Sequence, residues 1–253
     1  MSKIRQSPVV RVSAIGFHGE YTWRERHSDW GQLIWASRGT IDVMVERALW
    51  LVPTRTALWL PPGTANEVHM TGRGVLRLVF IDRRRARTLG PTPRVHVLTP
   101  LLRELLRRVT AMDTLSAEVP RDMRLLGVLL DELRDAGGAP VDLPMPADAR
   151  ALRAATFFRE RTSEPPALAD TARHAGASVR TLERLFRAET GLSLGAWCRR
   201  ARLMHAMTRL ADGESVTRAG IAAGYASTSA FVHAFRRLTG RTPGQSTSAT
   251  PKS

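Results

Sequence analysis

The stretch FRAETG, residues 186–191, recurs as FRRLTG, residues 235–240. Phenylalanine, arginine, threonine and glycine keep their places, 49 residues apart. Each copy closes a longer segment, residues 168–191 and 216–240, that reads as a short helix, a glycine, a turn and a longer helix. These are the parts of a helix-turn-helix unit. The sequence therefore predicts two such units in one chain.

The turns of the two segments carry matching signals. Gly176 and Gly224 can adopt the left-handed conformation that ends a helix without a Cβ penalty. Ser178 and Ser227 are expected to cap the helix that follows. The Thr-Gly pairs at the ends of FRAETG and FRRLTG then close the longer helices. One helix-turn-helix pattern is weak support, because many three-helix bundles show it, but two copies with matching caps are much stronger.

Between the copies, residues 194–212 predict a single helix. At 1.5 Å per residue it would span roughly 28 Å. Neighbouring major-groove segments on one side of DNA lie about 34 Å apart. A stiff connector of this length would set two recognition helices into successive grooves.

Residues 166–245 resemble the DNA-binding domain of the AraC/XylS family of transcription regulators. The resemblance covers about a third of the chain. It is carried by Leu168, Ala169, Ala172, Gly176, Ser178, Thr181, Leu182, Arg184, Phe186, Gly191, Arg202, Ala222, Gly224, Tyr225, Ser227, Phe231, Phe235, Gly240 and Pro243.

The resemblance implies roles for the outward side chains of both longer helices. Arginine bonds bidentately to guanine and glutamate accepts from cytosine, whereas phosphate contacts position the protein without reading sequence. The expected base-reading residues are Arg180, Glu183, Arg184, Ser229 and His233, and the expected phosphate-binding residues are Ser178, Arg187, Thr228, Arg236 and Arg237. His233 departs from the longer residue often found there, so the second helix is expected to anchor more than it reads.

The first hundred residues predict a different architecture. Short runs rich in β-branched and aromatic residues alternate with Gly/Pro turns, which is typical of a sandwich or barrel. The expected strands are 33–36, 40–46, 48–52, 56–61, 67–70 and 75–81. Residues 27–70 resemble the cupin-like sensor of the same family, through Trp30-Gly31-Gln32-Leu33, Gly39 and Pro61-Pro62-Gly63-Thr64.

A small barrel of this kind can hold a ligand in an apolar cavity with a few polar groups. The expected effector-pocket residues are His27, Trp35, Trp59, Asn66 and His69. Metal cupins instead gather several histidines and a carboxylate. Here Asp29 and Asn66 stand where histidine is common, so no metal and no cofactor is expected, although His27, Asp29, Glu67 and His69 remain conceivable ligands.

Helical patterns begin at residue 99. Thr99 is an expected N-cap with Pro100 at the first helical position. Leucine stripes in helices 99–109 and 121–135 would pack on the barrel and on a second copy, so residues 99–135 are the expected homodimer surface; packing within one chain is the alternative. The expected division is a sensor domain at 1–98, helices and linker at 99–147 with the linker itself at 136–147, the DNA-binding domain at 148–245 and a tail at 246–253.

Charge and composition fit this interpretation. The net charge is +15, and residues 147–253 carry 17 of the 38 basic residues against 8 of the 23 acidic ones. A basic domain favours a nucleic-acid partner, yet only two of the basic residues are lysine, a bias that a GC-rich genome also produces. One cysteine and no apolar run of membrane or signal-peptide length predict a cytoplasmic, nucleoid-associated protein.

The sequence thus predicts an α+β two-domain fold, with an N-terminal cupin-like β-barrel, accessory helices and a C-terminal all-α tandem helix-turn-helix domain. The expected function is sequence-specific transcription regulation in response to a small-molecule effector, not catalysis. Double-stranded DNA is the main partner and RNA polymerase a candidate one. The competing classes are a metal-dependent cupin enzyme with an accessory DNA-binding tail and a ligand-independent architectural DNA binder.

Overall fold

The structure is a computed structural model. It describes residues 7–25, 29–37, 41–70, 72–136, 138–139, 142–162, 164–211, 213–239 and 242–244. The chain divides into two compact units. The first comprises residues 1–43 and 52–140, and the second comprises residues 44–51 and 141–248. His27, Gly240 and the expected tail at 246–253 lie outside the described residues.

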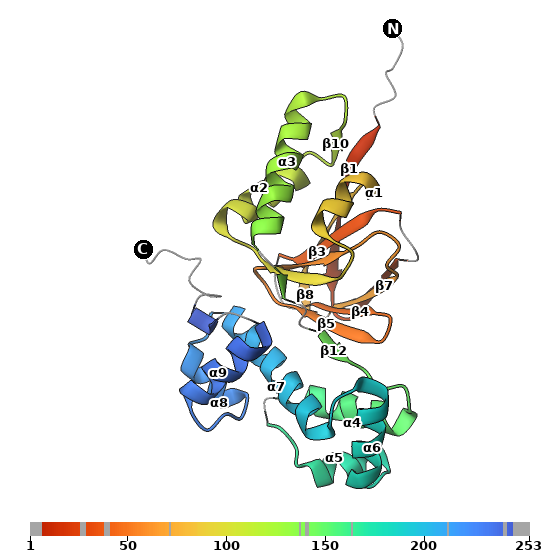
Figure 1. Cartoon of the computed structure of the whole chain (residues 1–253), viewed down its shortest axis with the longest axis vertical. Coiled ribbons are helices and arrows are strands. Elements are labelled where there is room, and N and C mark those ends of the chain that lie inside the picture. The colour runs from red at the N-terminus through yellow and green to blue at the C-terminus, as the bar shows by residue number, and fades with distance from the viewer. Residues whose placement is uncertain are drawn as a thin grey trace. The chain divides into compact units, whose positions relative to one another are not determined.

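The strands form two antiparallel sheets (Figure 1). The seven-stranded sheet has the order β10-β1-β8-β3-β6-β9-β11, and the five-stranded sheet has the order β12-β5-β4-β7-β2. The six strands expected between residues 33 and 81 are confirmed as β3 to β8, and the expected barrel consists of these two sheets, not of one closed cylinder. The bounds are β1 Pro8–His18, β2 Tyr21–Glu25, β3 Gly31–Ala36, β4 Ile41–Val45, β5 Ala48–Val52, β6 Thr56–Leu60, β7 Asn66–Met70, β8 Arg73–Ile81, β9 Arg94–Val97, β10 Thr114–Ser116, β11 Gly138–Ala139 and β12 Asp142–Pro144.

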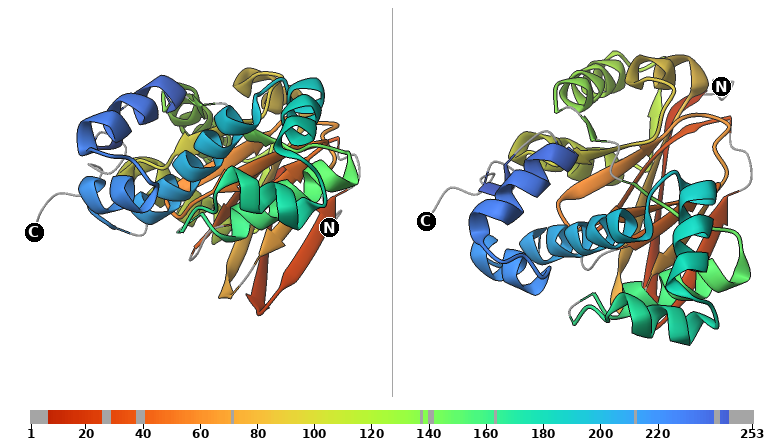
Figure 2. Two further views of the ribbon diagram at one scale, coloured as in Figure 1. Left: turned by 90° about the horizontal axis from the view of Figure 1, so that it is seen from below. Right: turned by 60° about the horizontal axis from the view of Figure 1, so that its bottom comes forward.

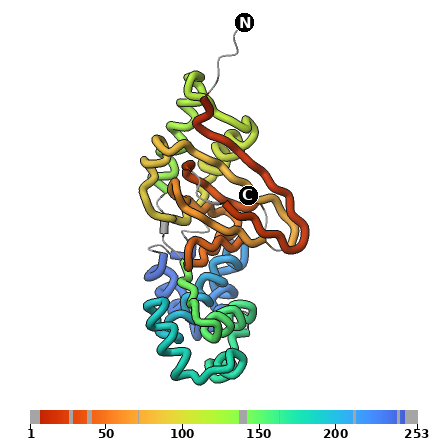
Figure 3. The backbone as a smooth tube through the Cα atoms, turned by 90° about the vertical axis from the view of Figure 1, so that its right-hand side faces the viewer, coloured from red at the N-terminus to blue at the C-terminus, as the bar shows by residue number. Residues whose placement is uncertain are grey.

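The first strand, β1, precedes the six strands expected from the sequence. It is eleven residues long, is drawn in red in Figure 3, and pairs with β8 from Val10 opposite Ile81 to His18 opposite Arg73. Its register places Val10 and Val12 on the same side as Ile81 and Val79. That side is the buried face on which the helices of the first unit pack.

Two helices cover this face of the seven-stranded sheet, namely α2 (Pro100–Thr110) and α3 (Pro120–Asp135). Thr99 caps α2 as expected, because its hydroxyl accepts the N–H of Leu102 at 3.1 Å. The leucine stripes pack against the tryptophans of β3 and β6. The shared core contains Trp35, Trp59, Leu102, Leu106, Leu126, Leu129, Leu130 and Leu133. A short helix, α1 (Arg83–Ala86), and a 3-10 turn, η1 (Arg87–Leu89), connect β8 to β9.

A buried histidine in this unit makes stability depend on pH. His96 of β9 is 3% exposed and lies opposite Ala57 of β6. Burial, together with the charge of Arg94, lowers the pKa of His96 to about 4, while the carbonyl of Leu133 opposes the shift. Above pH 6.5 the ring is neutral in both states. As the pH falls towards 4, the unfolded chain takes up the proton and the folded chain resists it.

We therefore expect the free energy of unfolding of this unit to fall by about 3 kcal/mol between pH 7 and pH 4 because of His96. Urea unfolding followed by tryptophan fluorescence measures it, since four of the six tryptophans, Trp23, Trp30, Trp35 and Trp59, lie in this unit. His96→Leu should remove this part of the pH dependence. Parallel pH curves for the two proteins would show that His96 is not the group responsible.

The expected linker is partly structured. Residues 142–144 form β12, which pairs with β5 through Leu143 opposite Leu49. The backbone of the same segment binds α7 (Leu194–Ala211). The indole Nε1 of Trp197 donates to the Pro144 carbonyl at 2.7 Å, and Arg200 donates to the carbonyl and carboxylate of Asp142 at 2.5 and 2.6 Å. Strand 142–144 thus belongs to the second unit.

The helices of the second unit match the expected repeat. The first helix-turn-helix comprises α5 (Leu168–Ala175) and α6 (Val179–Thr190), preceded by α4 (Ala149–Glu160). The second comprises α8 (Val216–Ala222) and α9 (Thr228–Thr239). Gly176 and Gly224 have φ values of 66° and 73°, so the left-handed turns predicted at both positions are confirmed.

One long helix, α7, runs between the two repeats (Figure 2) and contributes to the cores of both. Near its start, Trp197 packs edge-on against Phe158 and Phe186, with ring centroids 6.3 and 5.2 Å apart. Farther along, its buried leucines share a core with α8 and α9. That cluster is Leu203, Ala206, Leu210, Ala219, Ala223, Phe231 and Phe235. The 18 residues of α7 extend over about 27 Å.

Within the described residues, the structure contains no helix with the length and hydropathy needed to cross a membrane.

Candidate nucleic-acid interface

Helix α6 is strongly amphipathic. Its buried residues are Leu182, Leu185 and Phe186. The Ser178 hydroxyl caps its start by accepting the N–H of Thr181 at 3.1 Å, and Gly191, with φ of 72°, ends it. The caps fix where the helix begins and ends, so the side chains that remain on the opposite face have defined positions.

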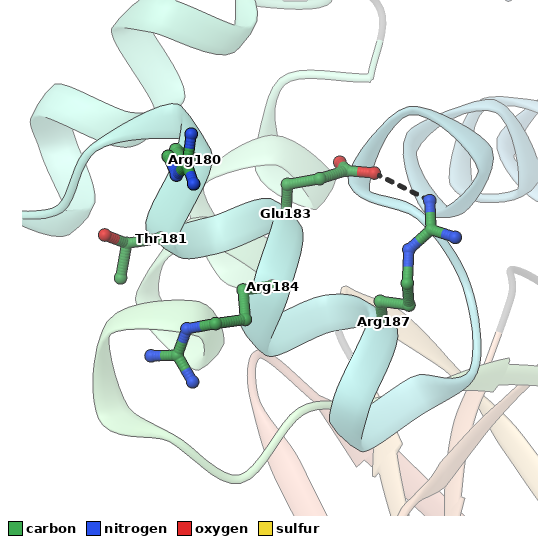
Figure 4. Close-up of a pocket in the computed structure, with 5 residues that line it drawn as sticks. All are labelled: Arg180, Thr181, Glu183, Arg184 and Arg187. Atoms are coloured by element: carbon green, nitrogen blue, oxygen red, sulfur yellow. Dashed lines mark hydrogen bonds and ion pairs between the residues drawn. The ribbon is translucent and has the colours of Figure 1, made fainter.

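The solvent-facing side of α6 carries three arginines. Together with Thr181 and Glu183 they line a cavity of about 420 Å³. Figure 4 shows Glu183 and Arg187 pointing toward each other, whereas Arg184 extends away from both. Arg184 and Arg180 make no hydrogen bond or ion pair with any residue that the structure describes. Two guanidinium groups are therefore available to an external acceptor.

Glu183 has an intramolecular role that its position alone did not indicate. One carboxylate oxygen accepts the N–H of Leu194, the first residue of α7, at 2.9 Å, and the other pairs with Arg187 at 3.4 Å. Ser193 caps the same helix by accepting the N–H of Ala196 at 3.2 Å. Glu183 therefore helps to fix the start of α7, and the oxygens that were expected to read a base already have partners.

This cap predicts a difference between two substitutions. Glu183→Ala should lower the free energy of unfolding by about 1 kcal/mol, because the Leu194 N–H at the helix start loses its acceptor. Glu183→Gln keeps an acceptor oxygen and should stay within about 0.5 kcal/mol of wild type. Urea unfolding of both variants measures the difference. Equal losses in the two variants would mean that the charge, not the hydrogen bond, matters.

A second acidic residue of α6 also has internal partners. One carboxylate oxygen of Glu189 accepts the N–H groups of Ala147 and Asp148 at 2.6 and 3.0 Å, at the start of α4. It also lies 3.6 Å from Arg47. Sequence analysis missed Glu189. The available signal was its place in the last turn of a helix, where the macrodipole disfavours a negative charge. With both glutamates engaged internally, the outward face of α6 is cationic.

The second repeat presents a less charged helix. The Ser227 hydroxyl caps α9 by accepting the N–H of Ala230 at 3.2 Å, as expected. Ser229 and His233 are exposed, while Phe231 and Phe235 are buried. The Thr228 hydroxyl lies 3.3 Å from that of Thr217 in α8. Arg236 and Arg237 are exposed near the end of the helix. The outward residues expected on α9 are thus on its surface.

Those of the expected effector-pocket residues that the structure describes do not come together. Trp35 and Trp59 face the helices, where the Trp59 indole donates to the Gly90 carbonyl at 3.3 Å. Asn66 is buried in β7 and donates to the Gln32 side chain at 3.0 Å. His69 is exposed, with Thr22 and Glu67 as partners. Residues that alternate along a strand lie on opposite faces of a sheet, so a list drawn from one sequence segment mixed these faces.

Of the conceivable metal ligands that the structure describes, Glu67 and His69 lie 2.9 Å apart, and the acidic groups have arginine partners. Asp29 pairs with Arg83 at 3.2 Å, and Glu67 pairs with Arg24 at 2.5 Å. Hydrogen bonding to Arg24 lowers the pKa of Glu67. In the described part of the chain, no group of three or more histidine, cysteine or acidic residues is placed to hold a metal ion.

Two helix-turn-helix units joined by one helix, with a cationic recognition face, define a DNA-binding protein. A family model described as a helix-turn-helix domain matches residues 171–248. The transcriptional regulator NimR of Escherichia coli is 34% identical over 215 residues, which are 85% of this chain and 78% of NimR. The regulator RipA of Corynebacterium glutamicum is 30% identical over 159 residues, 61% of this chain and 44% of RipA.

Among solved structures, ToxT from Vibrio cholerae aligns with 95% of this chain and 98% of its own, at 10% identity and a TM-score of 0.40. The extent of the match to NimR shows the family. The chain belongs to the AraC/XylS family of transcription regulators.

Proposed function

We propose that this protein reads two successive major-groove segments of an operator and that a small molecule bound by its N-terminal unit alters that binding. The observation that carries the proposal is the outward face of α6. It holds three arginines, two of which have no partner among the described residues, while both glutamates of the helix are engaged internally. Such a face complements phosphates and guanine edges.

The roles of individual side chains follow from their partners. We assign base reading to Arg180 and Arg184, because their guanidinium groups can reach an external acceptor without breaking an internal bond. Ser229 and His233 are proposed to read bases from α9. For Glu183 we propose a positioning role, since reading cytosine would cost the bond to Leu194. The proposed phosphate contacts are Ser178, Arg187, Thr228, Arg236 and Arg237.

The effector is proposed to act by binding two arrangements of the protein with different affinity, since a ligand with equal affinity for both would switch nothing. The segment around β12 is a candidate for the connection, because it pairs with β5 and also holds α7 through Trp197 and Arg200. The division into a sensor at 1–98, helices and linker at 99–147 and a DNA-binding domain at 148–245 remains our proposal for how the functions are distributed.

A homodimer through residues 99–135 is proposed from the apolar side chains that these helices leave outside. Leu101 of α2 is 51% exposed and Val128 of α3 is 46% exposed, beside buried leucines that serve the core. Sedimentation of wild type and of a Leu101→Glu, Val128→Glu double variant tests this. A monomeric wild-type protein at micromolar concentration would contradict it.

The family relationship implies a regulator, not an enzyme, and we extend this to a cytoplasmic protein that works at the nucleoid, with RNA polymerase as a further candidate partner. Fluorescence anisotropy on the upstream region of its own gene, with scrambled DNA as control and a salt series, tests the proposal. The wild type should prefer its own upstream DNA. Equal affinity for both DNAs, with the same dependence on salt concentration, would mean that the protein binds only phosphates and contradict the proposal.

A further inference from the structure

The first unit contains a second cavity lined by arginines, separate from the one on α6. It has a volume of about 260 Å³ and lies between α2 and strands of the seven-stranded sheet. Among the residues that line it are Arg55, Arg77, Arg103, Arg107, Trp35 and Leu106. No acidic residue is among the described residues of the lining. Four arginines thus line one cavity together with apolar side chains.

One of these arginines, Arg77, belongs to strand β8 of the seven-stranded sheet. It lies directly opposite Trp35 on the neighbouring strand, so the two side chains share the face of the sheet on which the helices pack. Arg77 is half-buried, yet it makes no hydrogen bond or ion pair with the residues that the structure describes. Holding a cation partly out of water without a counter-ion costs free energy. A bound anion would remove that cost.

The rim of the cavity comes from α2. Arg103 and Arg107 are four residues apart and therefore lie on one side of the helix, above the buried Leu106. Arg107 is held in place by Glu104, whose two carboxylate oxygens accept from its Nε at 3.0 Å. Glu104 offsets one of the four positive charges and does not line the cavity. The rim therefore retains an excess of positive charge.

The fourth arginine, Arg55, has an unusual backbone conformation. Arg55 has a φ of 71°, the left-handed region that residues other than glycine, asparagine and aspartate seldom adopt. The turn is fixed on both sides, since its carbonyl accepts the N–H of Leu98 at 2.8 Å and Thr56 donates its N–H to Pro53 at 3.1 Å. Backbone strain of this kind tends to persist at functional sites. Here the strained residue is one of those that line the cavity.

We propose that this cavity binds a small organic acid, with its carboxylate on Arg77 and Arg103 and a flat apolar body against Trp35 and Leu106. The guanidinium fork matches a carboxylate with two parallel hydrogen bonds. The volume is below that of a typical drug-sized pocket, and a ligand of about one ring would fill it. The inference rests on the proposed effector-responsive function and names the chemical class of the effector.

Benzoate is the probe for the test, with neutral benzamide as its uncharged counterpart. Saturation-transfer NMR and titration calorimetry on the full chain are expected to show one benzoate site per chain and at least tenfold weaker binding of benzamide. Benzoate should also change the affinity for the upstream DNA of the protein's own gene in the anisotropy assay. Binding of benzamide as tight as that of benzoate would overturn the anion site.

Matched arginine variants locate the site. Arg77→Gln and Arg103→Gln should each weaken benzoate binding at least tenfold, whereas Arg108→Gln, which removes an exposed arginine of α2 outside the lining, should stay within twofold. Arg77→Lys keeps the positive charge but lacks the two parallel donors of a guanidinium group. It should therefore recover only part of the benzoate affinity that Arg77→Gln loses. Melting temperatures within two degrees of wild type would show that each variant is folded. Equal effects of Arg103→Gln and Arg108→Gln would overturn the proposal.

The two assays separate this inference from the proposed function. If benzoate does not bind while the wild type still prefers its upstream DNA, the anion site is wrong and the regulator stands. If benzoate binds at this cavity but the DNA preference is absent, the proposed function fails and the site stands. If benzoate binds and leaves DNA affinity unchanged, the cavity is not the effector site.

Discussion

Replacing Arg184 by alanine is expected to narrow the preference for operator over scrambled DNA by roughly 10- to 100-fold, because a bidentate contact to guanine is worth about 1–3 kcal/mol of discrimination. Arg184 has no partner in the described structure, so its loss should leave the free energy of unfolding within about 0.5 kcal/mol of wild type. Fluorescence anisotropy on both DNAs measures the ratio, and urea unfolding checks the fold.

Arg187→Ala is the matched control on the same helix. Arg187 already pairs with Glu183 and is proposed to contact phosphate. Its removal should weaken binding to both DNAs alike and reduce the salt slope by about one. If Arg184→Ala instead behaves in this way, with both affinities falling together, then Arg184 contacts phosphate and the base-reading assignment is wrong.

Phe231→Ala is expected to cost about 3–5 kcal/mol, the usual loss for a fully buried phenylalanine. Its ring lies 5.9 Å from that of Phe235 and 5.5 Å from that of Tyr225. Gly220 packs so closely that a Cβ there would approach the ring to 3.0 Å. The cluster is small and contains few other large side chains. The loss of the Phe231 ring should therefore unfold α8 and α9. Operator affinity should then fall to that of the first repeat alone.

Hydrogen exchange resolved by segment measures this loss. Protection should disappear from α8 and α9 and persist in α4 to α6, because those helices form their own core around Trp197. Phe186→Ala is the counterpart in the first repeat and should give the opposite pattern. Loss of protection throughout residues 149–239 in either variant would mean that the two repeats unfold as one cooperative body.

The helices of the second unit were predictable because their signals are local. Gly176, Ser178 and Gly224 mark turns by backbone geometry and capping, which depend on a few neighbouring residues. Strands β3 to β8 were found for the same reason, since alternation and turn residues are short-range features. The outward positions of Arg180 and Arg184 followed directly from the helical period.

The partners of the side chains were not predictable in this way. Glu183 and Glu189 each bind a backbone segment that reaches them only after folding, 11 and about 41 residues away in the chain. Strand β12 was hidden because its Pro-rich composition resembles a linker until β5 supplies a partner. The sequence also did not show that Trp35 and Asn66 lie on different faces, because these faces are defined only when both sheets have formed.

The shared helix α7 has a consequence for how target sites can evolve. One end of this helix belongs to the core around Phe186, and the other end belongs to the core around Phe231. The helix therefore fixes the distance and the rotation between the two recognition helices, α6 and α9. An operator can drift in its bases one position at a time. With both repeats reading DNA as we propose, the operator should not tolerate the gain or loss of base pairs between its two halves, not even a full turn of the duplex. New binding sites would therefore arise by base substitutions at constant spacing, and insertions between the two halves would be selected against.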